Sequence, residues 1–395
     1  MDNTFSLNLS QVPMELKLII EILKSEDIDK EQYNLIELLK DTKWELFLDL
    51  AMHHRVYPLL YSKLTKMDKN LVPSYVLQTI TQTYVFNTYQ MLQFSGEMEE
   101  ISRLFNKNDI RLLCLKGPVI GVDLYGDVSL RTSGDLDFLI SIDDLVKAEE
   151  LLLNIGYEKD DYIKTVLNDW KWRHHHITYI HPEKKMKIEI HWRLNPGPGK
   201  EPNFSDLWKR KRKSSLTSYP IYYLGREDLF LFLVSHGARH GWSRLRWLLD
   251  INQISGQEVN WDHLTILLKK FNFFDVGGQA LILSSELFNT PIIKEMKILI
   301  NNNRAIKLAQ AAIFYLERMV NLHNDPVPTE IARYHKTHLF SLMSKKQRLV
   351  FITSFMYPYP EDAETLPLPN KIHFLYFLLR PFLWAWRKAK YRTVI

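Results

Sequence analysis

Cysteine, glycine and long apolar runs are scarce in this sequence. Its 395 residues include one cysteine, Cys114, and 14 glycines. A single cysteine excludes a disulfide within the chain and argues against a thiolate zinc site, and its apolar surroundings predict a buried, unreactive thiol. No run of 18 uninterrupted apolar residues occurs, and residues 1–5 lack the features of a signal peptide. We therefore expect a cytoplasmic protein without a membrane span.

The chain also has no large excess of either positive or negative charge. The chain has 51 Lys and Arg against 46 Asp and Glu, a net charge of +5, and an isoelectric point near 8.9. This mildly basic balance is compatible with an anionic substrate such as a nucleotide. It is too weak to indicate a nucleic-acid binder, and wide basic, aromatic-lined surfaces are not evident outside the last helix. Apolar residues are abundant, at 46%, and predict a sizeable core rather than disorder.

Apolar periodicity and glycine content divide the chain into three regions. Residues 1–104 have helical spacing of apolar positions and almost no glycine. Residues 105–225 contain short apolar runs ended by turn residues, which predict strands in a small α/β core. Residues 226–395 return to the helical pattern. A chain of this length has room for two or three domains, and we place the boundaries at these two changes.

Individual elements follow from the same patterns. The expected helices are Met14–Leu23, Glu45–Leu60, Tyr75–Phe105, 118–123, Asp143–Asn154, helices within Glu227–Val320, and Lys371–Lys388 with a kink at Pro381. The expected strands are Arg111–Leu115, Leu136–Ile140, Trp172–Ile180, Lys185–Leu194 and Tyr219–Leu224. A turn at Pro182 joins the third and fourth strands into a hairpin. The Pro-rich stretch Tyr357–Pro369 is expected to be irregular.

An Asp-x-Asp sequence supplies the first chemical signal. Asp135 and Asp137 are two residues apart in a predicted strand, so both point to one face, while Leu136 and Phe138 point to the core. Two neighbouring carboxylates repel each other, and burying them unpaired is costly. A divalent cation resolves this conflict, since Mg²⁺, with Mn²⁺ as a second option, binds through one or two carboxylates plus substrate phosphates.

Glu189 adds a third carboxylate. Alternation along the predicted strand Lys185–Leu194 places Glu189 on the face of Lys187, His191 and Arg193. If this strand neighbours the one with the two aspartates, the three acids converge on a site for two metal ions about 3.5–4 Å apart. The alternative is an exposed Glu189 paired with one of these basic residues. His191 is a candidate for substrate contact, for support of the acids, or for simple exposure.

Phosphate contacts are expected beside the acids. Lys116-Gly117 stands where a strand gives way to a helix, and backbone amides at a helix N-terminus favour anions, to which Lys116 adds a positive charge. Arg131 is placed to reach a phosphate or one of the acids, and a structural pairing with an aspartate is equally consistent. The chain contains no Gly-x-x-x-x-Gly-Lys-Ser/Thr loop, so this is not a P-loop protein.

Three further features allow more than one interpretation. His174–His176 resembles a metal-binding tract, but successive strand side chains alternate faces and cannot all converge on one ion, so we expect no zinc site there, although one of the three can line the cleft. His236, Arg239 and His240 share a helical face, which suits a metal or nucleotide site and ordinary packing alike. The final helix, residues 371–388, is basic and aromatic, and it either docks on the protein or makes weak contact with a membrane surface.

A family resemblance rests on the order of these motifs. The residues that carry it are Lys116-Gly117, Leu124-Tyr125-Gly126, Arg131, Asp135-Leu136-Asp137 and Ile188-Glu189-Ile190-His191-Trp192, flanked by Leu50, Ala51, His54, Arg55, Val56, Pro58, Leu59 and Leu60 and by His236, Gly237, His240, Gly241, Trp242, Trp247, Leu248 and Asp250. Together they resemble an uncharacterised bacterial nucleotidyltransferase family of the DNA-polymerase-β-like superfamily. The similarity covers about residues 40–255.

The resemblance implies an α+β fold with a small mixed-sheet core between two helical regions. It implies that Asp135, Asp137 and Glu189 bind metal in an enzyme that transfers a nucleoside monophosphate from an NTP and releases pyrophosphate. Glu189 is the implied group for deprotonating the acceptor, which is a small molecule, a peptide or a protein. The phosphate turn departs from the superfamily pattern, because Lys116-Gly117-Pro118 replaces the usual Gly-Ser or Gly-Gly and the gap to Asp135 is longer.

Two other classes of function stay open from the sequence. One is a catalytically inactive nucleotide-binding or regulatory protein on the same fold, against which the presence of all three acids argues. The other is a peripheral membrane protein in which the final helix is the functional part.

Overall fold

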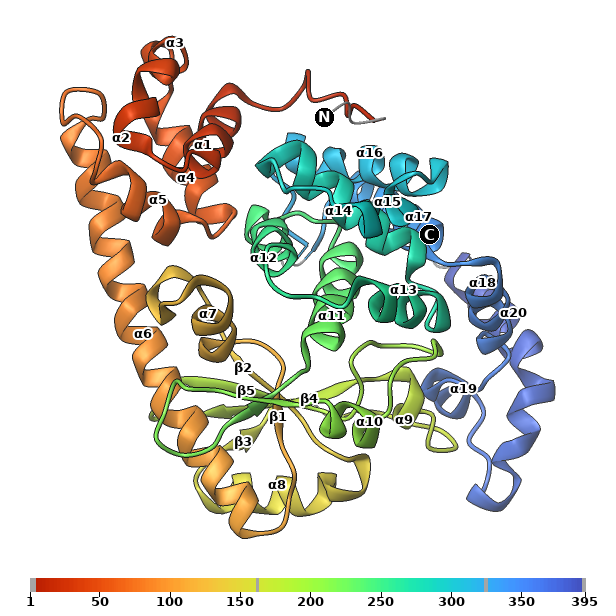
Figure 1. Cartoon of the computed structure of the whole chain (residues 1–395). Coiled ribbons are helices and arrows are strands. Elements are labelled where there is room, and N and C mark those ends of the chain that lie inside the picture. The colour runs from red at the N-terminus through yellow and green to blue at the C-terminus, as the bar shows by residue number, and fades with distance from the viewer. Residues whose placement is uncertain (1–4, 161–162, 323–325, 393–395) are drawn as a thin grey trace.

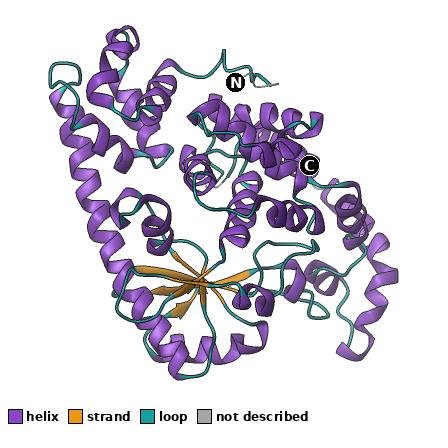
Figure 2. Ribbon diagram, viewed as in Figure 1, coloured by secondary structure: helices purple, strands orange, loops and turns teal. Residues whose placement is uncertain are grey.

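One mixed sheet lies at the centre of the molecule, with helices packed around it (Figures 1 and 2). The computed structural model describes residues 5–160, 163–322 and 326–392. The seven strands of the sheet are ordered β3-β4-β5-β2-β1-β7-β6. Their bounds are β1 Leu113–Cys114, β2 Leu136–Leu139, β3 Glu158–Lys159, β4 His176–His181, β5 Met186–His191, β6 Arg212–Lys213 and β7 Tyr222–Tyr223. The α+β fold class is therefore confirmed.

Both orientations of neighbouring strands occur in this sheet. β2 runs parallel to β5 and antiparallel to β1, whereas β1 runs parallel to β7. β4 pairs antiparallel with β5, which confirms the predicted hairpin, and β3 and β6 add short antiparallel edges that the sequence did not predict. Because β2 and β5 are distant in sequence, their pairing is the tertiary contact that assembles the site.

Helices precede, interrupt and follow the sheet. Those of the N-terminal region are α1 Met14–Lys24, α2 Ile28–Glu31, η1 Gln32–Leu35, α3 Ile36–Lys40, α4 Trp44–His53, α5 Tyr57–Leu64 and α6 Ser74–Lys107. Those between strands are α7 Pro118–Tyr125, η2 Val128–Leu130, η3 Ile142–Asp144, α8 Leu145–Asn154, α9 Trp170–Arg173 and α10 Phe204–Lys209. Those after the sheet are α11 Arg226–Arg239, α12 Leu245–Ser255, α13 Trp261–Lys270, α14 Phe274–Phe288, η4 Lys294–Met296, α15 Lys297–Ile300, α16 Asn303–Glu317, α17 Thr329–Leu342, α18 Lys345–Ser354, α19 Pro360–Thr365, η5 Asn370–Leu375 and α20 Tyr376–Arg392.

The long helix α6 connects the N-terminal helices to the sheet (Figure 1). Its 34 residues include a single glycine, Gly96, so little interrupts the helix, and at 1.5 Å per residue it spans roughly 50 Å. Its buried stripe runs from Val76 to Phe105. At the sheet end, Glu97 of α6 receives hydrogen bonds from Tyr157 and Lys184, which fix the helix against the hairpin.

One hydrophobic core extends through all three predicted regions. A single cluster of buried apolar residues runs from Phe5 to Leu316 and includes the large side chains Phe47, Phe138 and Phe230. α1 packs on α14 as well as on α4 and α5, so the N-terminal and C-terminal helices contact each other directly. The division into domains at residues 105 and 226 stays a prediction. Cys114 is buried in this core, as expected, and burial raises the pKa of its thiol.

Two of the elements predicted before the C-terminal segment need correction. The predicted helix Glu45–Leu60 is two helices, α4 and α5, because Arg55 takes a positive φ and Pro58 opens the first turn of α5. The predicted strand Trp172–Ile180 begins only at His176, since the preceding residues form the helical turn α9, closed by an ion pair of 2.6 Å between Arg173 and Asp169.

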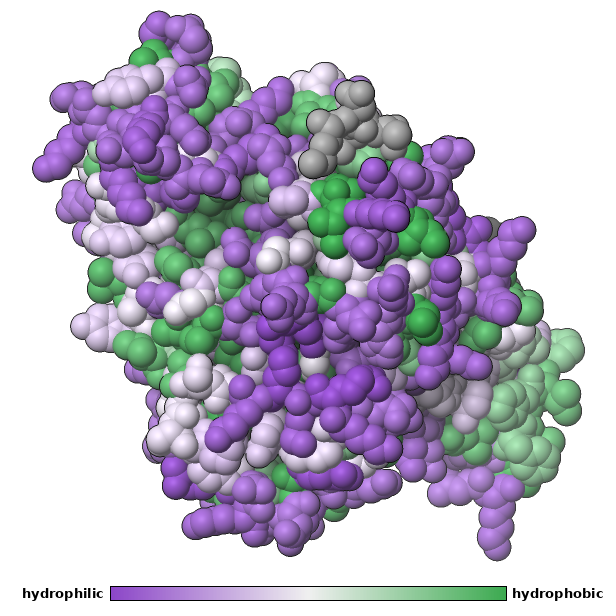
Figure 3. Space-filling model, viewed as in Figure 1, coloured by the Kyte–Doolittle hydropathy of each residue, from purple (hydrophilic) through white to green (hydrophobic). Residues whose placement is uncertain are grey.

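The C-terminal segment is more ordered than expected. The stretch predicted to be irregular contains α19, which starts with Pro360 and is capped by a hydrogen bond of 2.9 Å from the Tyr359 amide to Asp362. The predicted last helix is a 3₁₀ turn, η5, followed by α20 with Pro381 inside it. Apolar side chains gather on the surface over α20 (Figure 3). Among the described residues, no helix is both long enough and apolar enough to span a membrane.

Candidate active site

The pairing of β2 with β5 brings the predicted acids together. Asp137 lies directly opposite Glu189, and Leu139 opposite His191, so their side chains share one face of the sheet. The other face is apolar and fully buried. One ligand atom each from Asp137, Glu189 and His191 lies within 4.8 Å of the others. Asp135 stands just before β2 and connects to the group through Lys187, whose Nζ is 4.0 Å from Asp135 Oδ2. The structure therefore brings Asp137 and Glu189 together, whereas Asp135 adjoins them only through Lys187.

Three cationic groups contact these acids. Lys116 Nζ is 2.9 Å from Asp137 Oδ1, and His191 Nε2 is 3.1 Å from the same oxygen. Lys187 Nζ is 2.9 Å from Glu189 Oε1. The predicted alternative for Glu189, a pairing with Lys187, is thus present together with the convergence of the acids. The second oxygen of Asp137, Oδ2, is buried and has no hydrogen-bond partner among the described residues.

The surroundings of the three carboxyl groups shift their pKa values in different directions. Burial and the neighbouring Asp137 raise the pKa of Asp135, with partial compensation by Lys116. Burial alone would raise the pKa of Asp137, but the positive charge of Lys116 and the contact with His191 lower it. For Glu189, the contact with His191 likewise outweighs burial and holds the pKa below its usual range. Burial would lower the pKa of His191, but Asp137 and Glu189 raise it.

The turn at Lys116-Gly117 packs directly on the strand of the acids. Gly117 precedes α7 with φ 87° and ψ −151°, a conformation open almost only to glycine. A Cβ at Gly117 would lie 3.4 Å from Leu136 Cδ2, in van der Waals contact, so the turn lies directly against β2. This close approach brings the Lys116 ammonium onto Asp137, beside the N-terminus of α7 that was predicted to bind phosphate.

Arg131 has a different partner from the two groups first considered. Its guanidinium donates to both oxygens of Asp250 in α12, with Nε and Nη2 distances of 3.1 and 3.0 Å, and both residues are buried. This is the structural pairing with an aspartate that the sequence left open, with Asp250 rather than Asp135 or Asp137 as the partner. Asp250 is 119 positions away in sequence, so only the tertiary fold reveals this partner.

Several residues of the site were not predicted as such. His175 and His176 form a ring cluster with His191, and one nitrogen from each lies within 4.8 Å of the others. His174 is not a member of this group, so the three consecutive histidines do not all converge, but two of them do because His175 precedes β4 and is not held to the strand geometry. Arg239 of α11 donates to His175 Nε2 at 3.2 Å. Burial lowers the pKa of its guanidinium, and the negative charges of Glu189 and Asp137 partly offset this effect. The signal in the sequence was the shared helical face of Arg239 and His236, whose side chains lie 3.4 Å apart.

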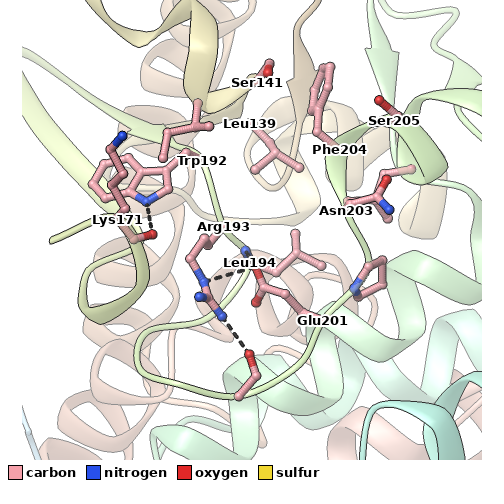
Figure 4. Close-up of a pocket in the computed structure, with 14 residues that line it drawn as sticks. Leu139, Ser141, Lys171, Trp192, Arg193, Leu194, Glu201, Asn203, Phe204 and Ser205 are labelled. Carbon is pink, nitrogen blue, oxygen red and sulfur yellow. Dashed lines mark hydrogen bonds and ion pairs between the residues drawn. The ribbon is translucent and has the colours of Figure 1, made fainter. Parts of the chain in front are cut away.

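A pocket of about 490 Å³ lies beyond the ends of β2 and β5 (Figure 4). Its wall begins at Leu139, two residues after Asp137, and continues with Trp192 and Arg193. Arg193 holds the loop in place through Glu201 at 3.4 Å and the Gly199 carbonyl at 2.7 Å. None of the predicted acids lines this pocket; along β2 its nearest wall residue, Leu139, is two strand residues, or about 6.6 Å, beyond Asp137.

This arrangement is typical of one class of enzyme. An Asp-x-Asp strand beside a parallel strand that presents a glutamate suits the transfer of phosphorus-containing groups. The chain belongs to the family described as uncharacterised nucleotidyltransferase, whose model matches residues 40–289. The match includes every acid of the site and extends through α14, and the protein is accordingly a nucleotidyltransferase. No curated protein and no solved structure matches the chain.

Proposed function

We propose that this enzyme transfers a nucleoside monophosphate from an NTP to an acceptor and releases pyrophosphate, with a divalent metal at Asp135, Asp137 and Glu189. The acceptor oxygen forms a bond to the α-phosphorus while the bond from that phosphorus to the pyrophosphate oxygen breaks. The acceptor loses its proton, and pyrophosphate leaves. We further propose that the family is a branch of the DNA-polymerase-β-like superfamily, on the order of its motifs.

The single observation that carries the metal is the unpartnered Oδ2 of Asp137. This oxygen is buried, and an unpaired buried carboxylate oxygen is costly unless a cation binds it. Glu189, directly opposite, turns its Oε2 toward His191 rather than toward Lys187. The unpartnered oxygen of Asp137 and the adjacent carboxylate of Glu189 supply the oxygen donors that Mg²⁺ and Mn²⁺ accept. A bound divalent ion would stabilise negative charge on the phosphate oxygens and favour loss of the acceptor proton.

The basic residues of the site would act on the triphosphate. Lys116 follows β1 at the N-terminus of α7, and its positive charge suits the leaving pyrophosphate. Lys187 and Arg239 add two positive charges beside the same acids. Glu189 keeps its negative charge because its pKa is lowered, so metal binding suits it better than the proton abstraction implied by the resemblance.

The decisive experiment measures pyrophosphate release from each NTP, with Mg²⁺ or Mn²⁺, by the intact chain and by the double variant Asp135→Asn, Asp137→Asn. We expect a loss of roughly 10³-fold, or about 4 kcal/mol of transition-state stabilisation. The matched control is Asp143→Asn, Asp144→Asn, two acids of the nearby turn η3 outside the site, which should leave the rate unchanged. Equal turnover by the two double variants would refute the assignment.

The acceptor and the alternative function are tested together. Incubation with radioactive NTPs, followed by mass spectrometry of the labelled product, would identify whether a small molecule, a peptide or a protein receives the nucleotide. Tight NTP binding without turnover across a broad set of acceptors would instead favour the inactive, nucleotide-binding class.

A further inference from the structure

An imidazole lies within the carboxylate group of the site. His191 is 3% exposed, and its Nε2 is 3.1 Å from Asp137 Oδ1 and 3.4 Å from Glu189 Oε2. Its other nitrogen, Nδ1, is buried and has no hydrogen-bond partner among the described residues. β5 holds the ring in this position because His191 follows Glu189 by two residues on the same face.

The spacing of these three atoms fits one coordination sphere. Ligand atoms bound at about 2.0–2.2 Å lie roughly 3.0–3.5 Å apart in octahedral or tetrahedral geometry. The distances of 3.1 and 3.4 Å from His191 Nε2 to the two carboxylate oxygens fall in this range. A metal ion would therefore replace the proton between the imidazole and the carboxylates without large movement of the side chains.

We propose that His191 is a metal ligand, so that the site combines imidazole with carboxylate and selects a first-row transition ion over Mg²⁺. This inference rests on the proposed function and adds to it the chemical class of the metal. Mg²⁺ strongly prefers oxygen ligands, whereas Mn²⁺, Fe²⁺, Co²⁺ and Zn²⁺ also accept imidazole nitrogen. From the sequence, carboxylates alone predicted Mg²⁺; the structure adds the nitrogen donor.

The neighbouring histidine group is the less suitable cation site. His175, His176 and His191 also bring three nitrogens within 4.8 Å. However, Arg239 donates to His175 Nε2 at 3.2 Å, which both occupies that nitrogen and adds a positive charge. Glu189 Oε2 lies 3.4 Å from His191 Nε2 but 3.8 Å from His176 Nε2, and Asp137 Oδ1 lies 3.1 Å from His191 Nε2, so the carboxylates are nearer to His191. The proposal therefore places the ion between His191 and the acids.

Binding of Mn²⁺ to the intact chain tests the proposal without reference to turnover. Electron paramagnetic resonance would give the Mn²⁺ affinity and its competition by Mg²⁺, and electron spin echo modulation would detect a coordinated ¹⁴N. We expect the nitrogen signal in the natural chain and its loss in His191→Asn, with Mn²⁺ affinity reduced at least tenfold and Mg²⁺ affinity changed less than threefold. His175→Asn is the matched control, and it should preserve the signal.

The outcomes separate this inference from the proposed function. Absence of a ¹⁴N signal, or an unchanged Mn²⁺ to Mg²⁺ ratio in His191→Asn, would overturn the inference even if NTP turnover persists. Loss of the signal in His175→Asn alone would move the ion to the histidine group and also overturn it. A ¹⁴N signal without any NTP turnover would support the metal ligand and refute the proposed reaction.

A second observation concerns the exposed side of α20. Positions four residues apart along η5 and α20 carry Phe374, Leu378, Phe382 and Trp386, which are 59%, 73%, 74% and 70% exposed. A solvated helix face normally carries polar side chains at such spacing. The opposite side of the helix is fixed to the protein, since Arg380 and Arg387 both bind the buried Asp362. The apolar stripe is therefore held outward (Figure 3).

We infer that this stripe lies on an anionic lipid surface. The stripe forms a projecting helix rather than a groove, it is rich in Phe and Trp, and exposed lysines flank it at Lys371 and Lys388. These are the features of an amphipathic helix that inserts its apolar side shallowly at the headgroup level. The ion pairs of Asp362 with both Arg380 and Arg387 hold helix α20 in one orientation, with its apolar side exposed.

Vesicle sedimentation of the full chain tests this surface. With phosphatidylglycerol-containing vesicles we expect binding that phosphatidylcholine vesicles do not give and that Leu378→Glu, Phe382→Glu reduces at least tenfold. Val146→Glu is the matched control, because Val146 of α8 is 72% exposed and lies outside the stripe. Equal sedimentation of all three proteins would overturn the inference. So would a dimer in analytical ultracentrifugation that only the double variant abolishes, since the stripe would then bind a second copy.

Discussion

The ion pair between Arg131 and Asp250 fixes the segment that leads to Asp135 against helix α12. Arg131 lies four residues before Asp135, and Asp250 receives Nε and Nη2 of Arg131 together with the Tyr125 hydroxyl at 2.9 Å. We expect Asp250→Asn to destabilise the protein because it leaves a buried guanidinium without a counter-charge. A second buried arginine, Arg246, also lies near Asp250 and would lose the same stabilising charge.

The magnitude follows from burial. Asp250 is fully buried and Arg131 is 2% exposed, so solvent cannot replace the lost charge. Removing one partner of such a pair costs about 3–5 kcal/mol, a fifth or more of the stability of about 5–15 kcal/mol of an ordinary domain. Replacing both partners by apolar residues of similar size, as in Arg131→Met, Asp250→Leu, removes the unpaired charge of Arg131 and should recover about 2 kcal/mol of that loss, while Arg246 still lacks the charge of Asp250.

Urea unfolding followed by circular dichroism measures these differences. Glu37→Gln serves as the control, because the Glu37–Lys40 pair is exposed and should contribute under about 0.5 kcal/mol. The reasoning would be refuted if Asp250→Asn cost less than about 1 kcal/mol, or if the apolar double variant were less stable than the single one.

Three further changes test other parts of the structure. Gly117→Ala forces a side chain into the glycine-only conformation and should cost about 1–3 kcal/mol in urea unfolding, whereas Gly134→Ala, with nothing within 4 Å of its Cβ, should cost clearly less. Lys187→Met removes the ammonium that competes for Glu189 and should raise Mn²⁺ affinity three- to tenfold by paramagnetic resonance; a decrease would contradict this competition. Burial lowers the pKa of His338 to about 4, below the value near 6.5 of an unfolded chain, so the folded state binds fewer protons and loses up to about 1.4 kcal/mol of stability per pH unit as pH falls from 6.5 toward 4; His338→Asn should show a shallower decline in urea unfolding.

Properties that depend on neighbours along the chain could be predicted from the sequence alone. Strand alternation has a period of two, so Glu189 and His191 in β5 had to share a face; Asp135 precedes β2, so alternation alone does not fix its side chain relative to that of Asp137. The hairpin of β4 and β5 follows from a short turn between two apolar runs, and the burial of Cys114 from its apolar neighbours. Such features are local and need no knowledge of the fold.

Contacts between distant segments were decided by the tertiary structure. Only the parallel pairing of β2 with β5 places Glu189 opposite Asp137, because nothing in either strand specifies which neighbour it takes. Arg131 takes Asp250 because α12 packs there, and His175 reaches His191 because the helical turn α9 ends before β4 begins. Alternation therefore determined which side chains share a face, whereas packing of elements far apart in sequence decided which of these faces meet and with which charges.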